Sequence, residues 1–133
     1  MLSFLLDTHI AIYVIKNKPL SALHLFNHHA RQMAVSAITL AELLHGAEKS
    51  NAPERSLGVV EDFCARLEVL PYGTKAAQHY GSIRSALEKR GETTGVNDLH
   101  IAAQARSEGL TLVSTNEREF ERVEALQLVT WVV

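Results

Sequence analysis

Three short and nearly continuous apolar runs, at residues 2–6, 33–38 and 110–113, most strongly constrain how this chain can fold. Runs of this length are typical of strands that are buried on both faces of a sheet. Between them, apolar residues recur every three or four positions, as in residues 39–48 and 75–90, which predicts amphipathic helices. Because strands alternate with helices, we expect an α/β fold with a central parallel sheet and helices on both of its faces.

The remaining elements follow from the same two patterns. Further strands are expected at residues 68–70 and within residues 126–133, and further helices at 8–15, 20–30, 53–67 and 98–108. Thr8 is the expected N-cap of the first helix. A chain of 133 residues without an internal repeat or linker is the size of one domain, so we expect residues 1–133 to form a single domain.

Cysteine usage and the N-terminus restrict the classes of protein further. The single cysteine, Cys64, excludes an intrachain disulfide and is expected to be a small core residue. The apolar N-terminus has no basic segment and is interrupted by Asp7, which argues against a signal peptide. No run approaches the roughly 20 apolar residues that span a bilayer. We therefore expect a cytoplasmic protein with no membrane partner.

The charge balance disfavours one kind of nucleic-acid binder. The 13 basic and 15 acidic side chains give a formal net charge of −2, whereas affinity from a broad basic surface grows with the number of phosphate contacts. A local basic rim around a small site remains compatible with this charge. Each candidate for such a rim also suits an ordinary solvated surface. The candidates are Lys16, Lys18, Lys49, Arg84, Lys89 and Arg90.

Several polar residues, most of them acidic, fall where predicted strands end or where the next helices begin. Asp7 directly follows the first strand, Glu42 lies in the first turn after the second strand, and Asp98 opens a later helix. Asn116 and Glu119 follow the third apolar run. A parallel sheet gathers such positions at the carboxyl edge of its strands, where ligands bind in folds of this class.

Carboxylates gathered at one place raise one another's pKa values, and a divalent cation removes this cost. Ligand sets made of oxygen favour Mg²⁺ or Mn²⁺ over zinc. Such a cation activates water and stabilises the charge on a phosphodiester. The pattern therefore points to metal-assisted phosphodiester hydrolysis.

Each of these residues also fits a purely structural role at a helix N-terminus, so none is convincing alone. Acidic and small polar side chains accept hydrogen bonds from the free N–H groups there. The structural alternatives are Asp7 as a helix-entry residue beside Thr8, Glu42 in a capping box with Thr39, Asp98 in a first turn capped by Asn97, and Asn116 in a capping box with Glu119.

Four segments together carry a family resemblance: LLDTHIAIYVIK, VSAITLAELLHGAEKS, NDLHIAAQAR and LVSTNEREFERV. Their sequences, order and separations resemble the PIN domain of VapC-type toxins, the ribonuclease halves of bacterial type II toxin–antitoxin pairs. The resemblance extends over nearly the whole chain. It implies a compact PIN-like α/β fold and a Mg²⁺- or Mn²⁺-dependent endoribonuclease activity.

The resemblance also implies four acidic positions. The first three fall on Asp7, Glu42 and Asp98. The fourth usually lies in a Thr-x-Asp-like pattern after the later strand. That position here holds Asn116, so the chain departs from the fully acidic pattern. Glu119, three residues further on, is the expected substitute carboxylate.

Roles follow from the same resemblance. Asp7 and Asp98 are expected to ligate Mg²⁺ or Mn²⁺ directly. Glu42 and Glu119 are expected to bind the cation through water or to position the attacking water. Thr8, Thr115 and Asn116 are expected to support the metal shell or the substrate phosphate, with capping as the alternative for Thr8.

The early helices carry more apolar side chains than a small core obviously needs. The resemblance suggests that they form a homodimer face and a groove for the C-terminal segment of a VapB-like antitoxin, and burial within the monomer is the structural alternative. We therefore expect a homodimer and a toxin–antitoxin hetero-oligomer. The side chains concerned are Ile12, Tyr13, Leu43 and Leu44.

The expected function is thus a Mg²⁺-dependent endoribonuclease toxin that acts on RNA, with initiator tRNA as the substrate suggested by resemblance, and that a cognate antitoxin inhibits. Two alternatives stay open. One is a PIN-domain nuclease for RNA processing or structure-specific DNA cleavage. The other is a noncatalytic RNA- or protein-binding module of the same fold, which Asn116 favours and the three acids oppose.

Overall fold

One parallel sheet organises the molecule, and a computed structural model describes it over residues 1–131. The strand order is β3-β2-β1-β4-β5, and every neighbouring pair is parallel, as predicted. Residues 132 and 133, the end of the last predicted strand segment, lie outside the described residues. The strands are β1 (Phe4–Leu6), β2 (Met33–Ser36), β3 (Glu68–Leu70), β4 (Thr111–Ser114) and β5 (Leu128–Thr130).

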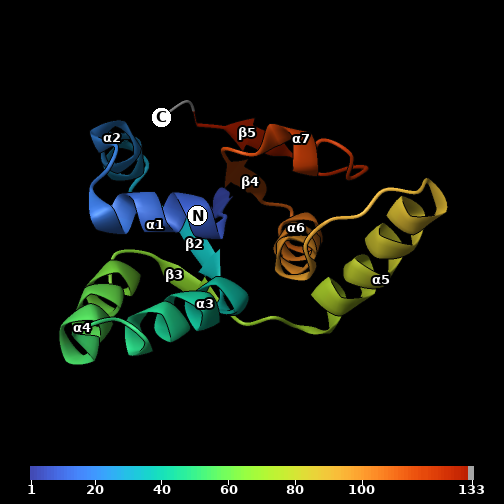
Figure 1. The fold of residues 1–133 in the computed structure, drawn as a ribbon. Helices are drawn as coiled ribbons and strands as arrows, with labels where there is room; N and C mark the ends of the chain where they lie inside the picture. The colour runs from blue at the N-terminus through green and yellow to red at the C-terminus, as the bar shows by residue number, and fades with distance from the viewer. Residues whose placement is uncertain (132–133) are drawn as a thin grey trace.

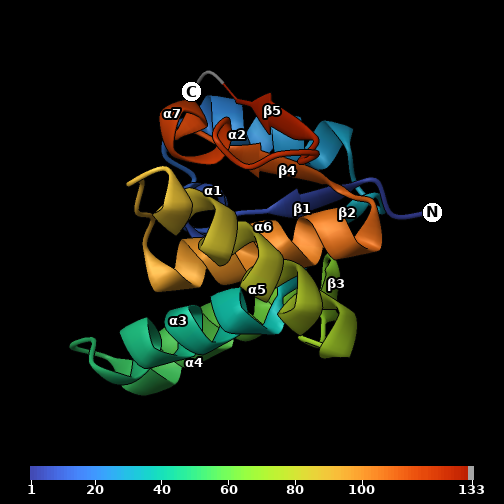
Figure 2. The same cartoon turned by 90° about the vertical axis from the view of Figure 1, so that its right-hand side faces the viewer.

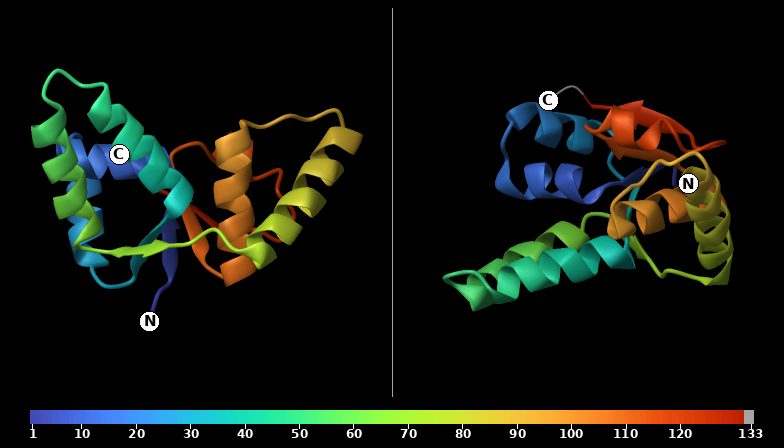
Figure 3. Two further views of the ribbon diagram at one scale, coloured as in Figure 1. Left: turned by 90° about the horizontal axis from the view of Figure 1, so that it is seen from below. Right: turned by 45° about the vertical axis from the view of Figure 1, so that its right-hand side comes forward.

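Helices cover both faces of the sheet, which confirms the predicted architecture. Figure 1 shows α1, α2 and α4 on one side and α5 and α6 on the other, and the view from below in Figure 3 separates the same two groups. No described helix is both long enough and apolar enough to cross a membrane. The helices are α1 (Thr8–Lys16), α2 (Leu20–His28), α3 (Ala37–Glu48), α4 (Pro53–Cys64), α5 (Thr74–Lys89), α6 (Val96–Glu108) and α7 (Glu117–Phe120).

The alternation of side chains along the strands divides the interior into two hydrophobic cores. Leu6 packs with α1 to α4 on one face, whereas its neighbour Leu5 packs with α5 and α6 on the other. Strands buried on both faces in this way explain why the apolar runs are continuous rather than alternating. Cys64 packs, half-buried, against the first core, as expected.

The strand order contains one topological switch point. The chain moves outward from β1 through β2 to β3, and then returns to place β4 on the other side of β1. Figure 2 shows β4 beside β1 after this return. In open α/β sheets, ligands bind at the carboxyl ends of the two strands that flank such a point. The site is therefore expected where β1 and β4 end.

The second strand ends earlier than predicted. Ser36 is the last residue of β2 and also the N-cap of α3, because its Oγ accepts a hydrogen bond from the Ile38 N–H at 3.0 Å. Thr39 consequently lies inside α3, and the proposed capping box with Glu42 is wrong. Ser36 is a single polar residue within an otherwise apolar run, and Thr39 is an equally good capping residue three positions later, so periodicity alone does not locate the boundary.

Candidate active site

Asp7 lies at the carboxyl edge of the sheet, directly after β1 and beside β4. Its N–H donates to the Val113 carbonyl at 3.0 Å, and its carboxylate is the N-cap of α1, accepting from the Ile10 N–H at 2.9 Å. The predicted N-cap, Thr8, is instead the first residue of the helix. Aspartate and threonine are both good N-cap residues. Asp7 takes the role because it is the residue directly after β1 and has the extended backbone of an N-cap.

The Asp7 carboxylate is enclosed, with 2% of the residue exposed. This burial raises its pKa, and the hydrogen bonds from the Ser114 side chain and the Ile10 N–H and the charge of His9 only partly oppose the rise. Ser114 is a supporting residue that the sequence analysis missed. Its only signal in the sequence is a hydroxyl at the end of a buried strand.

The start of α6 places Asp98 in the first helical turn, as predicted. Gly95, rather than Asn97, is the N-cap of this helix, and no side chain caps it. The Leu99 N–H donates to the Gly95 carbonyl at 2.9 Å, which closes the first turn around Asp98. The helix therefore begins two residues earlier than predicted, at Val96.

Asp98 lies close to two other carboxylates. Burial, the charge of Glu119, a hydrogen bond with that side chain and the charge of Asp7 together raise the pKa of Asp98 to about 6, and His9 opposes them. Carboxylates affect one another in this way only at short range. Three acids that are far apart in the sequence, from β1, α6 and α7, therefore form one cluster, which we call the acidic cluster (Asp7, Asp98 and Glu119).

Asn116 and Glu119 combine the two roles that the sequence left as alternatives. Asn116 is the N-cap of α7, with its Oδ1 accepting from the Glu119 N–H at 3.4 Å, while its Nδ2 donates to Glu119 Oε2 at 2.7 Å. The other carboxylate oxygen, Oε1, accepts from the Gly95 N–H at 3.3 Å. The capping residue thus holds the acid that faces Asp98. Glu117, which is nearer in sequence to Asn116, is exposed.

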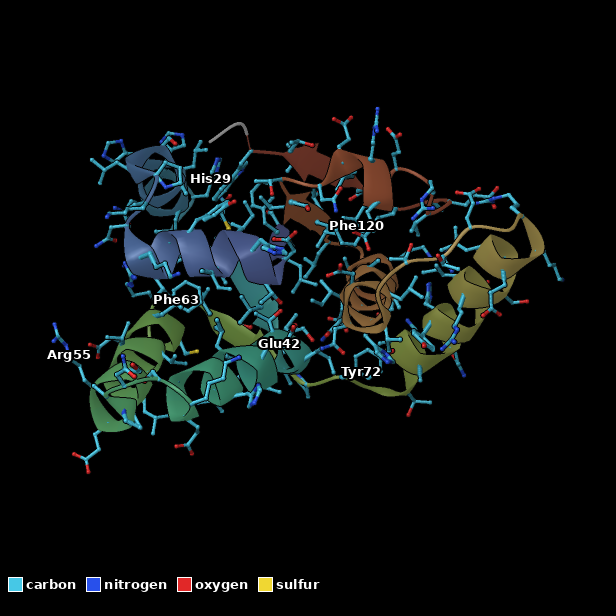
Figure 4. The ribbon with its side chains drawn as sticks, in the orientation of Figure 1. His29, Glu42, Arg55, Phe63, Tyr72 and Phe120 are labelled. Carbon is cyan, nitrogen blue, oxygen red and sulfur yellow. The ribbon has the colours of Figure 1, made fainter. Side chains whose placement is uncertain are left out.

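Glu42 approaches the cluster from α3, on the side of that helix that faces α1 (Figure 4). Thr8 Oγ1 donates to Glu42 Oε1 at 2.9 Å and lies 3.0 Å from the hydroxyl of the buried Thr39. Glu42 and Asp98 line one cavity of about 550 Å³, together with Thr8 and His9. Glu42 therefore faces the same cavity as Asp98 from the opposite helix.

The donor set fits a hard divalent cation. Oxygen atoms of carboxylates are the ligands that Mg²⁺ and Mn²⁺ prefer, and the mutual repulsion of Asp98, Glu119 and Asp7 is relieved by positive charge. Over residues 1–131, no three His, Cys, Asp or Glu side chains form a complete metal-binding group. The fit therefore rests on the chemistry of the donors and on their repulsion.

Other predicted residues lie outside the cluster. Over the described residues, Thr115 follows β4 without a side-chain hydrogen bond, and two of the proposed basic residues, Arg84 and Arg90, form ion pairs with Glu88 and Glu92. A basic rim stays a prediction.

The cluster predicts an unusual pH dependence of stability in the absence of divalent cations. The folded protein holds the Asp98 proton up to about pH 6, whereas the unfolded chain releases it near the ordinary value of 3.8. The folded state binds more protons in this window, so the free energy of unfolding falls as pH rises from about 4 to 6. Because Asp98 is half-exposed and screened by water, we expect a loss of about 1 to 2 kcal/mol.

Urea denaturation in EDTA between pH 4 and 7.5 measures this effect. Asp98→Asn should show a smaller fall, with only the contribution of Asp7 remaining, and should be more stable than wild type at pH 7. If the free energy of unfolding falls equally in wild type and Asp98→Asn, the fall comes from titratable groups other than Asp98.

A comparison with protein families agrees with this geometry. The model of the PIN domain matches residues 4–126, which is most of the chain. The chain therefore belongs to the PIN-domain family.

Close relatives show to which group of the PIN-domain family this chain belongs. Ribonuclease VapC2 from Haemophilus influenzae is 58% identical over 132 residues, 99% of this chain and 100% of that protein. The tRNA(fMet)-specific endonuclease VapC from Shigella flexneri is 50% identical over 131 residues, 98% of this chain and 99% of that protein. A crystal structure of DNA-bound VapBC from Salmonella typhimurium contains a chain with a TM-score of 0.94 and 50% identity, covering 99% of this chain and 100% of that one. Within the PIN-domain family, this chain is a member of the VapC group, as the resemblance predicted.

Proposed function

We propose that this chain is a metal-dependent endoribonuclease toxin that hydrolyses phosphodiester bonds of RNA and that a cognate antitoxin inhibits. The observation that carries the proposal is the acidic cluster, in which Asp7, Asp98 and Glu119 meet at the switch point of the sheet. Relatives that are named ribonucleases support RNA as the substrate and favour this function over a noncatalytic module.

We assign Asp7 and Asp98 as the residues that would hold Mg²⁺ or Mn²⁺, with Glu119 beside them. When bound, such a cation neutralises charge on the phosphodiester and makes water a stronger nucleophile. The chain's own residues fix the ligands in place. The Ile10 N–H donates to Asp7 Oδ1 and the Asn116 side chain donates to Glu119 Oε2, which limits the rotation of both carboxylates.

Glu42 is the residue that we assign to the attacking water. The Thr8 hydroxyl occupies its Oε1, so Oε2 is available to accept a hydrogen bond from water in the cavity that Glu42 and Asp98 line. A carboxylate held in one orientation aligns the water and accepts its proton as the new bond forms. Thr8 thus acts by orienting Glu42.

We propose initiator tRNA as the substrate, because the Shigella flexneri relative is named for that tRNA. Purified protein with Mg²⁺ should cut initiator tRNA at one position, and elongator methionine tRNA at least about 10-fold more slowly, since recognition of RNA depends on its shape. Mapping of the 5′ ends and timed gels measures both rates. Equal cutting of the two tRNAs would refute this substrate, and cutting of neither would refute it as well.

A groove of about 390 Å³ between α1, α3 and α4 is where we expect the antitoxin to bind. Its lining is largely apolar and includes Ile12, Leu43 and the 41% exposed Val59. Of the other two residues predicted for partners, Tyr13 packs against the first core and Leu44 is 38% exposed. The homodimer stays a prediction.

Val59→Asp should weaken antitoxin binding by roughly 10-fold or more, because a charge would have to be buried in the apolar groove. The change lies on the surface, so RNA cleavage by the free toxin should persist. Calorimetric titration with the antitoxin encoded beside the toxin measures the loss. Val129→Asp, at an equally exposed valine of β5 (37%), is the matched control and should bind normally. Equal binding by both variants would place the antitoxin elsewhere.

A further inference from the structure

Arg122, just after α7, ties together two segments that are far apart in the sequence. Its Nη2 donates to the Thr93 carbonyl at 2.9 Å and to Thr94 Oγ1 at 2.8 Å. Its Nη1 lies 3.4 Å from Glu92 Oε2. All three partners belong to the loop of residues 91–95 between α5 and α6, so one guanidinium holds this loop at three successive residues.

Arg90 completes the connection. Its Nε donates to Glu92 Oε1 at 3.0 Å, and its Nη2 donates to the Arg122 carbonyl at 2.8 Å. Glu92 therefore bridges two arginines, one through each carboxylate oxygen. The Glu92 and Arg122 side chains are each 29% exposed, so their ion pair is partly shielded from water.

Both tied segments lead directly to the acidic cluster. The loop ends at Gly95, which is the N-cap of the helix that carries Asp98 and which donates its N–H to Glu119 Oε1. On the other side, Arg122 lies three residues after Glu119, and its Nε donates to the Glu119 carbonyl at 3.4 Å. The guanidinium thus joins the backbone on either side of the Asp98–Glu119 pair.

The charges of Asp98 and Glu119 repel each other, which favours separation of the two segments when no cation is bound. Among the described residues, the Arg122 guanidinium forms no hydrogen bond or ion pair with either carboxylate. An arginine paired with either acid would neutralise the cluster and compete with a cation. Because Arg122 pairs with Glu92 instead, it holds the two segments together and leaves the negative charge of the cluster available to bind a cation.

We propose that Arg122 is a positioning residue that holds the loop of residues 91–95 against α7, so that Asp98 and Glu119 stay close enough to serve one divalent cation. The proposal rests on the metal-dependent function proposed above. It adds a residue that touches neither the cation nor the substrate and acts through the backbone that carries the acids.

Positioning and simple electrostatics predict opposite effects. If only charge mattered, removal of a cationic side chain near the acids would strengthen cation binding. If Arg122 positions the acids, Arg122→Gln weakens binding despite the loss of a positive charge. Arg118 provides the matched control, because it is exposed on α7 next to Glu119, and Arg118→Gln removes the same charge from the same segment.

Calorimetric titration of the purified toxin with Mn²⁺ tests the proposal. We expect Arg122→Gln to bind Mn²⁺ about 10- to 100-fold more weakly than wild type, as is typical when the supports of metal ligands are removed. Arg122→Lys should also be weakened, because an ammonium group cannot serve three separated acceptors in the fixed geometry of a guanidinium. Arg118→Gln should bind at least as tightly as wild type. Unchanged or tighter binding by Arg122→Gln overturns the proposal.

A second measurement needs no cation. In EDTA, the amides of residues 92–95 and 116–119 should exchange hydrogen about 10-fold or more faster in Arg122→Gln than in wild type, while those of β1 and β4 stay protected. Exchange at the wild-type rate overturns the positioning role. If wild type binds no Mn²⁺, the metal assignment of the proposed function fails, and the exchange result alone decides the role of Arg122.

Discussion

Asp7→Asn and Asp98→Asn should each reduce RNA cleavage by roughly 1000-fold or more, because each removes a charged ligand from the cation site on which the reaction depends. Asparagine keeps the size of the side chain and remains a good N-cap, so Asp7→Asn should retain the hydrogen bond with the Ile10 N–H. The measurement is kcat/KM of the purified variants on the tRNA substrate.

Two controls separate this loss from damage to the fold. Asp62→Asn removes an exposed acid from α4 and should cleave at the wild-type rate. Urea denaturation should show that Asp98→Asn is at least as stable as wild type at neutral pH, since the repulsion within the cluster is reduced. Full activity of Asp7→Asn would remove this residue from the active site.

Removal of divalent cations should have an effect of similar size. In EDTA we expect cleavage to fall by about 1000-fold or more, and added Mg²⁺ or Mn²⁺ should restore it, because the carboxylates by themselves neither neutralise a phosphodiester nor activate water. Cation binding should also stabilise the folded state, by about 2.7 kcal/mol when the cation concentration is 100 times its Kd. Timed cleavage and thermal unfolding measure the two effects.

The thermal experiment includes its own control. The melting temperature of Asp98→Asn should respond to Mn²⁺ far less than that of wild type, which would place the stabilisation at the cluster rather than at the general surface. Undiminished cleavage in EDTA would contradict a metal-dependent mechanism, whatever the response of the melting temperature.

The fold was largely predictable because strands buried on both faces leave a simple pattern in the sequence. Continuous apolar runs identified β1, β2 and β4, and their alternation with helices predicted the parallel sheet. Helix starts were less predictable. Asp7 and Thr8 are both good capping residues, and only the end of β1 at Leu6 decides between them. For the same reason, the sequence pattern predicted Thr39 as the cap of α3, whereas the structure shows Ser36 in this role.

The sequence indicated which residues belong to the candidate site, but it did not indicate the contacts between them. Acids at the end of a strand or at the start of a helix indicated Asp7 and Asp98, because a parallel sheet brings such positions together. The family resemblance was needed to single out Glu119, which the structure then places against Asp98. Nothing local in the sequence indicated Arg122, since its partners in the loop of residues 91–95 are brought to it only by the tertiary fold.

Crystals soaked in Mn²⁺ and measured for anomalous scattering test most directly the claim that these acids form a cation-dependent nuclease centre. We expect an anomalous peak within about 2.5 Å of carboxylate oxygens of both Asp7 and Asp98, and its loss in Asp98→Asn. A peak bound elsewhere on the protein, with none between Asp7 and Asp98, would contradict the claim.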